Sequence, residues 1–366
     1  MLSSISRYRK AISAALQAAV EKVASSADTD LLRPYYGQMQ YHLGWLDAQF
    51  RPAEHNTAKL LRPTLLLLAY EAAGAWGLAN EHPTTYLQRA LPAAVAIELM
   101  HNFTLIHDDI VDKDEERRHR KTVWKLWGIP HAINTGDGMF ALSRLSLWQS
   151  LEQGVDGSTA ARLAAVLDRA ILTVAEGQYL DISFEKRQDV SVAMYLDMIQ
   201  RKTAALMSAA AEMGAILGTR DEQTITGLRN FGNAIGIAFQ VRDDLLGVWA
   251  STAELGKTPA GDIYRRKKSL PFLHALEHAS SEDRQQLQDI YQQEKAITPR
   301  QVEQVLTIFA RTQTQEYCHS FLAEQCQRAY TALARVPRAS TGPVVSHALD
   351  DMEKLVRFVE EAGPAA

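Results

Sequence analysis

The chain has few cysteines. Among its 366 residues, only Cys318 and Cys326 are cysteine, and they stand eight positions apart in YCHSFLAEQC. This spacing is not the CxxC of redox and zinc sites, and two cysteines do not make the disulfide framework of a small secreted protein. We therefore expect two free thiols in a protein of the reducing cytoplasm.

Long apolar runs and an excess of basic charge are also absent. No apolar run reaches about 18 residues without a charge, which argues against a membrane-spanning helix. The formal net charge is −4, so no overall basic field would attract nucleic acid. The N-terminal segment has basic residues before an alanine-rich run, but Gln17, Glu21 and Lys22 interrupt it. An amphipathic first helix is therefore favoured there over a signal peptide.

Alternating polar and apolar residues, the pattern of β-strands, are nearly absent, and helix signals dominate the sequence. Thr298, Pro299 and Gln301 make an N-terminal capping pattern. Pro92 is expected to stand at the start of a helix of about 20 residues that contains no further proline or glycine. The sequence therefore predicts an all-α fold.

A single domain over residues 1–366 is expected, with an N-terminal helix within 1–30 and a C-terminal helix and tail over 344–366. With 46% hydrophobic residues, the chain can bury a substantial core. Its loops are too short to link independent domains, and no internal repeat is present. At typical helix lengths we expect about ten to a dozen helices.

An acidic cluster follows the apolar run LPAAVAIELMHNFTLI. On a helix, Asp108 and Asp112 lie on one face with Asp109 beside them, and His101 falls on almost the same stripe two turns earlier. Two carboxylates at this spacing destabilise a helix by about a few tenths of a kcal/mol, and a helix C-terminus disfavours negative charge. The cluster therefore suggests an external cation. Oxygen ligands with room for water and phosphate suit Mg²⁺.

A basic run, RRHRK at 117–121, comes directly after these acids. Arginine side chains match phosphate oxygens with paired hydrogen bonds, and Mg²⁺ can bridge carboxylate to phosphate. By itself, a solvated charged helix end explains the run equally well. A second cluster of the same kind is needed to decide between the two interpretations.

The segment IGIAFQVRDDLLG supplies that second cluster. Gln240, Asp243 and Asp244 share a face at the end of an apolar helix. A loop containing Lys257 follows and leads to a second basic run, RRKK at 265–268. Two such patterns in one chain are hard to explain as solvated surfaces. They predict two acidic helix ends that face each other across a bundle, with bases around them.

Across nearly its whole length, the sequence resembles the trans-isoprenyl diphosphate synthases of the polyprenyl synthetase family. DDIVDKDEERR is similar to the first aspartate-rich motif of that family, DDxxDxxxxRR, and FQVRDDLLG is similar to the second. AKLLRP resembles GGKRxRP, RKTAAL the Lys-Thr motif, EGQYLD the GQxxD motif, and GKTPAGDIYRRKKSLP the Gly-Lys loop. The resemblance implies an isoprenoid-synthase-type helical bundle with a central apolar cavity, and a homodimer.

The resemblance also implies a reaction, in which isopentenyl diphosphate condenses head-to-tail with an allylic diphosphate in the presence of three Mg²⁺ ions. The implied catalytic residues are Asp108, Asp109, Asp112, Lys202, Asp243 and Asp244, of which Asp108, Asp112 and Asp243 would bind the metal. The allylic diphosphate would be held by Arg117, Lys202, Thr203, Gln240 and Lys257. Isopentenyl diphosphate would be held by Lys59, Arg62, His101 and Arg118. The wall of the metal site would be lined by Gln178 and Asp181, and Lys267 would close on the diphosphate.

Two motifs depart from the family pattern. Thr57, Ala58 and Leu60 replace the two glycines and the arginine of GGKR, which weakens the expected grip on isopentenyl diphosphate. Gly247 stands where the second DDxxD motif usually ends in aspartate. We expect Asp243 to serve the third metal ion alone.

The same resemblance partly predicts the product length. In that family, residues just before the first aspartate motif form the closed end of the tube that holds the growing chain. Phe103 and Thr104 precede Asp108 by five and four residues, and helical geometry places Thr104 one turn below it. A small residue with one aromatic neighbour resembles the pattern of synthases that make C20 products. Geranylgeranyl diphosphate is therefore the expected product, with farnesyl or longer prenyl diphosphates as alternatives.

Other functions remain open at this point. His107 next to Asp108 resembles the His-Asp pair of all-α phosphohydrolases, although that class does not explain the second acidic cluster. A class I terpene cyclase would need only the allylic substrate, but Gly247 and Ser251 do not fit its second metal motif. A non-catalytic subunit of a heteromeric synthase usually loses the first aspartate motif, which is intact here.

Overall fold

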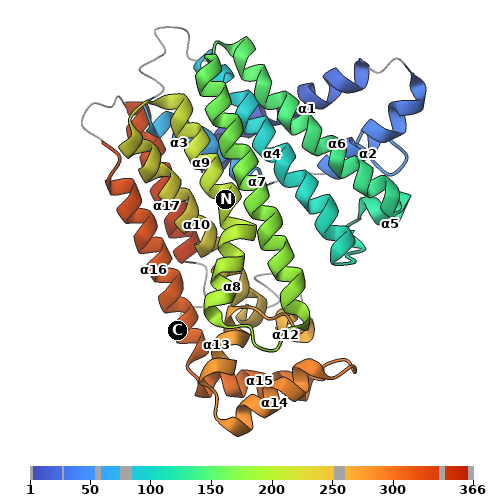
Figure 1. Cartoon of the computed structure of the whole chain (residues 1–366), viewed down its shortest axis with the longest axis vertical. Coiled ribbons are helices and arrows are strands. Elements are labelled where there is room, and N and C mark those ends of the chain that lie inside the picture. Colours follow the sequence, from blue (N-terminus) through green and yellow to red (C-terminus); the bar gives the residue numbers. More distant parts are fainter. Residues whose placement is uncertain are drawn as a thin grey trace. The chain divides into compact units, whose positions relative to one another are not determined.

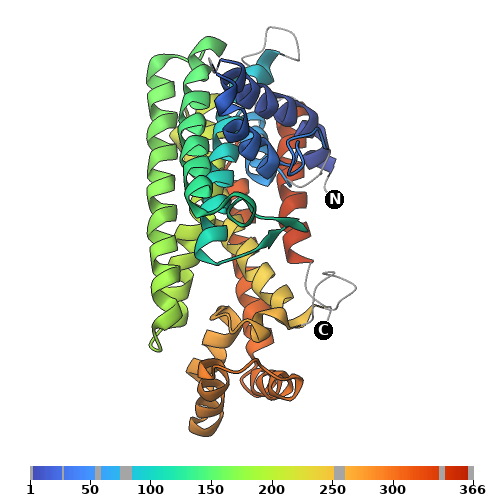
Figure 2. The same ribbon diagram turned by 90° about the vertical axis from the view of Figure 1, so that its right-hand side faces the viewer.

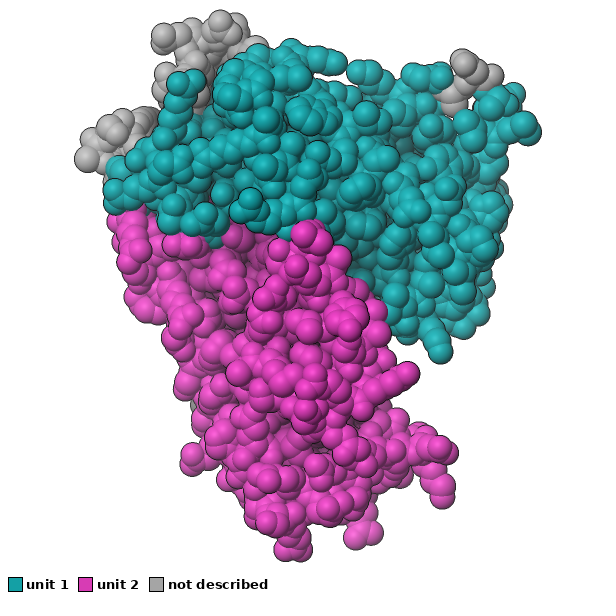
Figure 3. Space-filling model, in the orientation of Figure 1, with its two compact units in different colours: residues 1–171, 209–229, 336–351 teal, residues 172–208, 230–335, 352–366 magenta. Residues whose placement is uncertain are grey.

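The computed structural model describes residues 3–26, 29–53, 59–74, 85–250, 260–337 and 343–361 (Figure 1). The chain divides into two compact units, which are coloured separately in Figure 3. Unit 1 comprises Met1–Ile171, Ala209–Arg229 and Val336–Asp351. Unit 2 comprises Leu172–Ser208, Asn230–Arg335 and Met352–Ala366.

Unit 1 is built from helices and one short hairpin, which is visible in Figure 2. Its α-helices are α1 (Ser3–Ser25), α2 (Arg33–Leu43), α3 (Leu61–Ala72), α4 (Thr85–Val111), α5 (Val123–Trp127) and α6 (Ile129–Trp148). It also contains two 3₁₀ turns, η1 (Asp30–Leu32) and η3 (Gln149–Gln153), and two strands, β1 (Glu116–Arg117) and β2 (Arg120–Lys121). Helix α1 is the helix that the sequence predicts within residues 1–30.

Four helices contribute residues to both units: α7 (Gly157–Lys186), α9 (Ala205–Gly218), α10 (Glu222–Trp249) and α17 (Pro343–Glu360). Unit 2 adds α8 (Val192–Ile199), a π-helical segment η4 (Gln200–Ala204), α12 (Gly261–Tyr264), α13 (Leu270–His278), α14 (Ser281–Gln292), α15 (Pro299–Arg311) and α16 (Thr314–Ala334). In the described part of the chain, strands are limited to the hairpin of unit 1, so the all-α prediction is confirmed.

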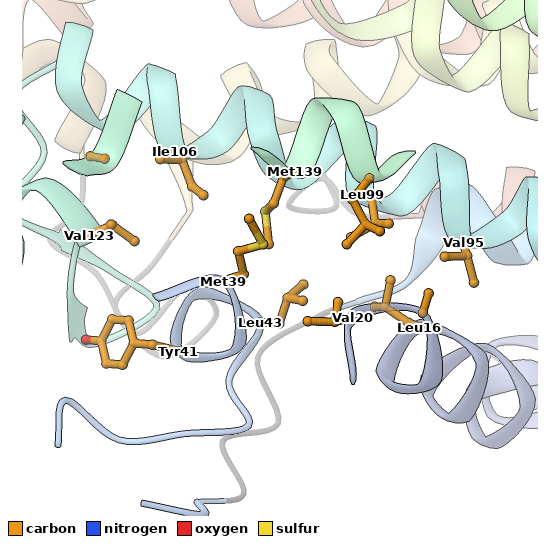
Figure 4. Close-up of a cluster of buried hydrophobic side chains, with 13 residues drawn as sticks. Leu16, Val20, Met39, Tyr41, Leu43, Val95, Leu99, Ile106, Val123 and Met139 are labelled. Atoms are coloured by element: carbon orange, nitrogen blue, oxygen red, sulfur yellow. The ribbon is translucent and has the colours of Figure 1, made fainter. Parts of the chain in front are cut away.

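A buried apolar cluster in unit 1 holds helix α4, which carries the first acidic cluster. Val95 and Leu99 of α4 pack with Leu16 of α1, Met39 of α2 and Met139 of α6 (Figure 4). All five side chains are at most 3% exposed. Burying an aliphatic side chain of this size contributes about 1.5–3 kcal/mol. The apolar run before Asp108 therefore fixes α4 and with it the position of the acidic helix end.

Several expectations about local structure can be checked directly. Thr298 and Gln301 make the predicted capping box at the start of α15, with Pro299 in the first turn. Cys318 and Cys326 are free, and both are buried. Among the described helices, none combines the length and apolarity that crossing a membrane requires.

Two expectations about the helices are wrong. Pro92 does not begin a helix but lies inside α4, seven residues after its start. A proline there removes one backbone hydrogen bond, and the close packing of α4 against its neighbours compensates for this loss. The described residues also contain sixteen α-helices rather than ten to a dozen. Pieces as short as α5 and α12 have too few residues to show a period in the sequence.

Candidate active site

The first acidic cluster lies at the C-terminal end of α4 in unit 1. The Asp112 backbone N–H donates to the Asp108 carbonyl oxygen at 2.8 Å, so helical geometry continues to Asp112 and the two carboxylates lie on one face. Asp108 is half-buried and Asp112 is exposed. This pair can take up a cation that has water and phosphate oxygens as its other ligands.

Asp109 differs from its neighbours because its side chain is only 2% exposed. Its Oδ1 accepts a hydrogen bond from Arg117 Nε at 2.6 Å. Burial raises the pKa of Asp109 to about 6, although the Arg117 guanidinium opposes this effect. Its Oδ2 has no hydrogen-bond partner in the described structure. A buried carboxylate oxygen is rarely left without a donor, and a metal-bound water beside Asp108 would supply one.

The basic run that follows is folded into the β1–β2 hairpin. The two strands pair antiparallel, and Arg118 and His119 form the turn between them. Their φ angles are 54° and 61°, the geometry of a type I′ turn, in which asparagine and glycine are usual. Larger residues in this conformation cost on the order of 1 kcal/mol or more each and are found at ligand-binding sites.

Arg120 has a structural role in this hairpin. Its guanidinium donates to the carbonyl oxygens of Tyr41 at 2.8 Å and Leu46 at 2.9 Å. It also lies over the Tyr41 ring, 3.9 Å from the ring centroid. Arg120 therefore fastens the hairpin to the end of α2. Its guanidinium group is used in this contact, so Arg120 is not one of the basic residues that bind phosphate.

A basic cluster in unit 1 brings together three of the residues predicted to hold isopentenyl diphosphate: Arg62 and His101, which are half-buried, and Arg118, which is exposed. Burial, together with the charges of Arg62 and Arg118, holds the pKa of His101 well below its usual value. Burial lowers the pKa of Arg62 to about 10, and the nearby carboxylate of Glu98 partly offsets this effect. Arg62 Nε has no hydrogen-bond partner in the described structure. The cluster therefore offers an unsatisfied buried donor, which suits an anionic ligand.

The GGKR-like motif is only partly described. Thr57 and Ala58 lie outside the described residues, and Lys59 is exposed. Leu60, which replaces the arginine of the family motif, is 4% exposed and has a φ of 51°. It packs into the core at the start of α3, so it cannot replace the lost arginine at a diphosphate.

In unit 2, the π-helical segment η4 carries Lys202 and Thr203. Two glycines let neighbouring helices approach it closely. A Cβ atom on Gly177 of α7 would lie 2.3 Å from the Lys202 backbone nitrogen, and one on Gly236 of α10 would lie 2.7 Å from Ala204 Cα. Single π-helical turns within α-helices often occur at functional sites. Gly177, the glycine of EGQYLD, is therefore needed because any side chain there would collide with the backbone of the Lys-Thr motif.

The acid of EGQYLD pairs with the Lys-Thr motif. Asp181 Oδ2 accepts a hydrogen bond from Lys202 Nζ, and the two side chains are 38% and 24% exposed. Asp181 is four residues after Gly177, so one face of α7 supplies both the close backbone contact and the ion pair. Gln178 Nε2 is buried and has no hydrogen-bond partner in the described structure.

The second acidic cluster continues this hydrogen-bond network. Thr203 Oγ1 donates to Gln240 Oε1 at 3.1 Å, and Gln240 Nε2 donates to Asp244 Oδ1 at 3.1 Å. Asp244 is 0% exposed and also accepts hydrogen bonds from the Tyr195 hydroxyl and from Lys267 Nζ. It is therefore the centre of a buried polar network.

Asp243 is exposed, in contrast to Asp244. It lies one position earlier at the end of α10, and one position on a helix is a rotation of about 100°. The two adjacent acids therefore differ in their surroundings: Asp243 is exposed, whereas Asp244 is buried and fixes other side chains. Lys257, the next predicted substrate-binding residue, lies outside the described residues.

Lys267 joins the second cluster from the loop after α12. Its Nζ donates to Asp244 Oδ1 at 3.1 Å and lies 3.6 Å from Asp262 Oδ2. Burial would lower the pKa of Lys267, but these two carboxylates outweigh it and raise the pKa. The ammonium group is therefore charged and held at the end of α10.

Sequence reasoning missed three residues of these networks: Glu98, Tyr195 and Asp262. Glu98 has a signal in the sequence, since it lies one helical turn before His101. Asp262 lies within the quoted Gly-Lys loop motif, five residues before Lys267, but the resemblance assigned it no role. Tyr195 comes from a segment 49 residues away from Asp244, and spacing within a motif does not reveal it.

In the described residues, no group of three or more His, Cys, Asp or Glu side chains is placed to hold a metal ion. A site closed by protein ligands alone, as in structural zinc sites, is therefore absent from that part of the chain. One or two carboxylates at each cluster leave room for Mg²⁺ only with water and substrate oxygens.

The residues predicted to limit product length lie on α4 before Asp108. The Phe103 ring packs edge-to-face with Phe140, at 5.5 Å, and with His107, at 5.4 Å. Thr104 Oγ1 donates to the His101 carbonyl oxygen at 2.7 Å. His107 Nε2 in turn lies 3.2 Å from the Ile133 carbonyl oxygen. This contact joins His107 to α6.

Comparison with known proteins identifies close relatives. Residues 45–309 match the family model described as polyprenyl synthetase. A (2E,6E)-farnesyl diphosphate synthase of Mycobacterium tuberculosis is 41% identical over 246 residues, which is 67% of this chain and 64% of that protein. The chain thus spans a little less than two thirds of the length of that relative. A geranylgeranyl diphosphate synthase of the same organism is 34% identical over 83% of this chain and 81% of its own length.

A solved structure shares the fold. The crystal structure of a polyprenyl synthetase from Streptomyces coelicolor superposes with a TM-score of 0.83 at 34% identity. The match covers 98% of this chain and 99% of that one.

Proposed function

The chain belongs to the polyprenyl synthetase family, and from that premise we propose that it is a Mg²⁺-dependent trans-prenyltransferase. It condenses isopentenyl diphosphate head-to-tail with an allylic diphosphate, and geranylgeranyl diphosphate is the proposed product. The observation that carries the proposal is the end of α4, where Asp108 and Asp112 share a face and Arg117 is held at 2.6 Å from Asp109.

The proposed metal ligands are Asp108, Asp112 and Asp243, with three Mg²⁺ ions in all. When bound, Mg²⁺ supplies positive charge that stabilises the departing diphosphate. The free Asp109 Oδ2 and the half-buried or exposed carboxylates around it support this assignment. The carboxylates leave the remaining coordination positions to water and substrate.

The side chains of the chain itself bind and orient the two diphosphates. The proposed allylic site uses Arg117, Lys202, Thr203, Gln240, Lys257 and Lys267. The proposed isopentenyl diphosphate site uses Lys59, Arg62, His101 and Arg118. Each fixed positive group stabilises negative charge that grows on the leaving diphosphate, and removing one such group typically lowers the rate about 100-fold or more. Holding the double bond of isopentenyl diphosphate near the allylic carbon favours condensation over quenching by water.

A product assay tests the proposal. The purified chain with Mg²⁺ receives isopentenyl diphosphate together with dimethylallyl, geranyl or farnesyl diphosphate, and parallel samples receive each allylic diphosphate alone. We expect elongated diphosphates only when isopentenyl diphosphate is present, with C20 as the main product by mass spectrometry.

The same assay separates the rival functions. Hydrocarbon or alcohol formed from the allylic substrate alone would support a terpene cyclase and would contradict the proposal. The altered GGKR-like motif, with Leu60 buried at 4% exposure, is the observation that favours this second candidate. A chain that turns over no substrate under any of these conditions would be assigned as a non-catalytic subunit.

Replacing Thr104 with phenylalanine is expected to shorten the product from C20 to C15. Thr104 lies one helical turn before Asp108 on α4, where the resemblance places the floor of the chain-binding tube, and an aromatic ring there would fill that space. The measurement is the product distribution by mass spectrometry. Thr104→Val, which keeps the size of the side chain but removes the hydroxyl group, should leave the product length unchanged. An unaltered distribution in Thr104→Phe would place the floor elsewhere.

The proposed homodimer accounts for an exposed apolar face on the part of α7 in unit 2. Leu172, Tyr179 and Ile182 lie on one side of this helix and are 62%, 71% and 43% exposed. Contiguous exposed apolar side chains of this size mark interaction surfaces. Tyr179→Glu is therefore expected to convert the dimer to a monomer in analytical ultracentrifugation. Glu185→Arg, an exposed change off this face of the same helix, should leave it dimeric. A wild-type monomer would refute the dimer.

A further inference from the structure

The second acidic motif departs from the family pattern at Gly247, and the structure places another carboxylate against that position. Asp262 of α12 is 4% exposed. A Cβ atom on Gly247 would lie 2.4 Å from Asp262 Oδ2 and 2.5 Å from its Cγ, closer than real side chains approach. A side chain at position 247 and the Asp262 carboxylate in its present place therefore exclude each other.

Asp262 contributes to a cluster of alternating charges in unit 2. Its Oδ1 accepts a hydrogen bond from Arg265 Nη2 at 2.7 Å. Its Oδ2 lies 3.6 Å from Lys267 Nζ, which also donates to Asp244 at 3.1 Å. The Lys267 backbone N–H donates to the Asp262 carbonyl oxygen at 2.9 Å. Lys267 is thus bound to Asp262 through both its main chain and its side chain.

The position of Lys267 depends on Asp262, and the position of Asp262 depends on Gly247. Asp244 lies on α10, Asp262 lies on α12, and the ammonium group of Lys267 lies between their carboxylates. The absence of a side chain at Gly247 lets Asp262 reach the surface of α10. The two carboxylates are buried, with side-chain exposures of 0% for Asp244 and 6% for Asp262, and a buried charge is costly to leave unpaired.

We propose that Asp262 is a positioning residue that occupies the space left by Gly247 and holds Lys267 against the acidic end of α10. The proposal rests on the proposed function in so far as Lys267 serves a diphosphate. Asp262 does not touch substrate in this role. It fixes the direction of Lys267, the side chain proposed to contact the diphosphate, and a side chain at position 247 would displace Asp262 from its present place.

The test measures the position of Lys267 without substrate or metal. Limiting acetic anhydride is added to the full-length chain at constant pH, and the acetylation rate of each lysine is read by peptide mass spectrometry. Only a neutral, accessible amine reacts, so the two carboxylates slow the reaction of Lys267. Asp262→Asn is expected to raise its rate about tenfold, the effect of about one pKa unit. Gly247→Ala should give the same increase by displacing Asp262.

Three controls make the result specific. Lys268 donates to the carbonyl oxygens of Phe184, Glu185 and Arg187, so its acetylation should stay at the wild-type rate in every variant. Arg265→Gln removes the neighbouring ion pair of Asp262 and should not affect Lys267. Asp262→Glu should restore part of the protection.

The outcomes distinguish a positioning role of Asp262, through Lys267, from a purely structural role in α12. An unchanged Lys267 rate in Gly247→Ala, or an increase in Arg265→Gln as large as that in Asp262→Asn, would overturn the proposal and leave Asp262 as a structural residue of α12. In the product assay, Asp262→Asn is expected to lower kcat about tenfold, with Asp262→Glu intermediate. A wild-type chain that made no prenyl product would refute the proposed function but not the acetylation result.

Discussion

Gly177→Ala is expected to lower kcat about 100-fold. The new Cβ atom would lie 2.3 Å from the Lys202 backbone nitrogen, 2.7 Å from its Cα and 2.9 Å from the Arg201 carbonyl carbon. These are backbone atoms, so no side chain can rotate away, and either α7 or η4 must shift. A displacement of about 1 Å at a group that orients substrate can cost about 100-fold in rate. Lys202 and Thr203 would move together.

The same substitution is expected to destabilise the fold by about 1–3 kcal/mol, the usual cost of overpacking. Gly157→Ala is the matched control, because Gly157 is in the same helix and a Cβ atom there would meet nothing within 4 Å. It should be neutral or stabilising by up to about 1 kcal/mol, since alanine favours helices over glycine. Steady-state kinetics and thermal unfolding of both variants provide the measurement. Equal behaviour of the two alanines would contradict the close approach of α7 to η4.

The fold was predictable where local sequence decides it. The capping residues Thr298, Pro299 and Gln301 satisfy one another within a single turn, so their sequence determines the start of α15. Pro92 shows the limit of this reasoning. Its position inside α4 depends on packing against other helices, and local preference gives no measure of that packing.

The candidate site was predictable to the level of motifs, but the sequence did not reveal the task of each residue. Motif spacing identified Asp108, Asp112 and Asp243 as candidate ligands. It did not show that Arg120 would donate its hydrogen bonds to the carbonyl oxygens of Tyr41 and Leu46 in the same unit. A basic side chain takes whichever acceptor the folded chain brings near it, and contacts between residues about 75–80 positions apart leave no periodic signal.

The burial of Asp109 and Asp244 shows the same limit on a finer scale. Each is adjacent to an acid that is more exposed, and each is at most 2% exposed itself. A rotation of about 100° along the helix separates the two positions of each pair. Which of them faces inward is set by the elements packed against the helix, here the hairpin through Arg117 and α8 through Tyr195.

Replacing either of the adjacent acids Asp243 and Asp244 with asparagine is expected to give two different defects. Asp244→Asn should lower the free energy of unfolding by about 2–3 kcal/mol. The carboxylate accepts hydrogen bonds from Tyr195, Gln240 and Lys267, and an amide has only one acceptor oxygen, so at least one donor loses its partner. Since Lys267 is 43% exposed, water compensates part of the loss, and the cost stays below that of a fully buried ion pair.

Asp243→Asn should behave in the opposite way. Its side chain is exposed, and exposed substitutions usually change stability by less than about 0.5 kcal/mol. As a proposed metal ligand it should nevertheless be essential, and its loss is expected to lower kcat about 100-fold or more, since a fixed charge at the leaving diphosphate is removed. Urea unfolding of the metal-free chain and kcat at saturating Mg²⁺ measure the two effects separately. A strongly destabilised Asp243→Asn that kept its activity per folded molecule would reverse the assignment of these two acids.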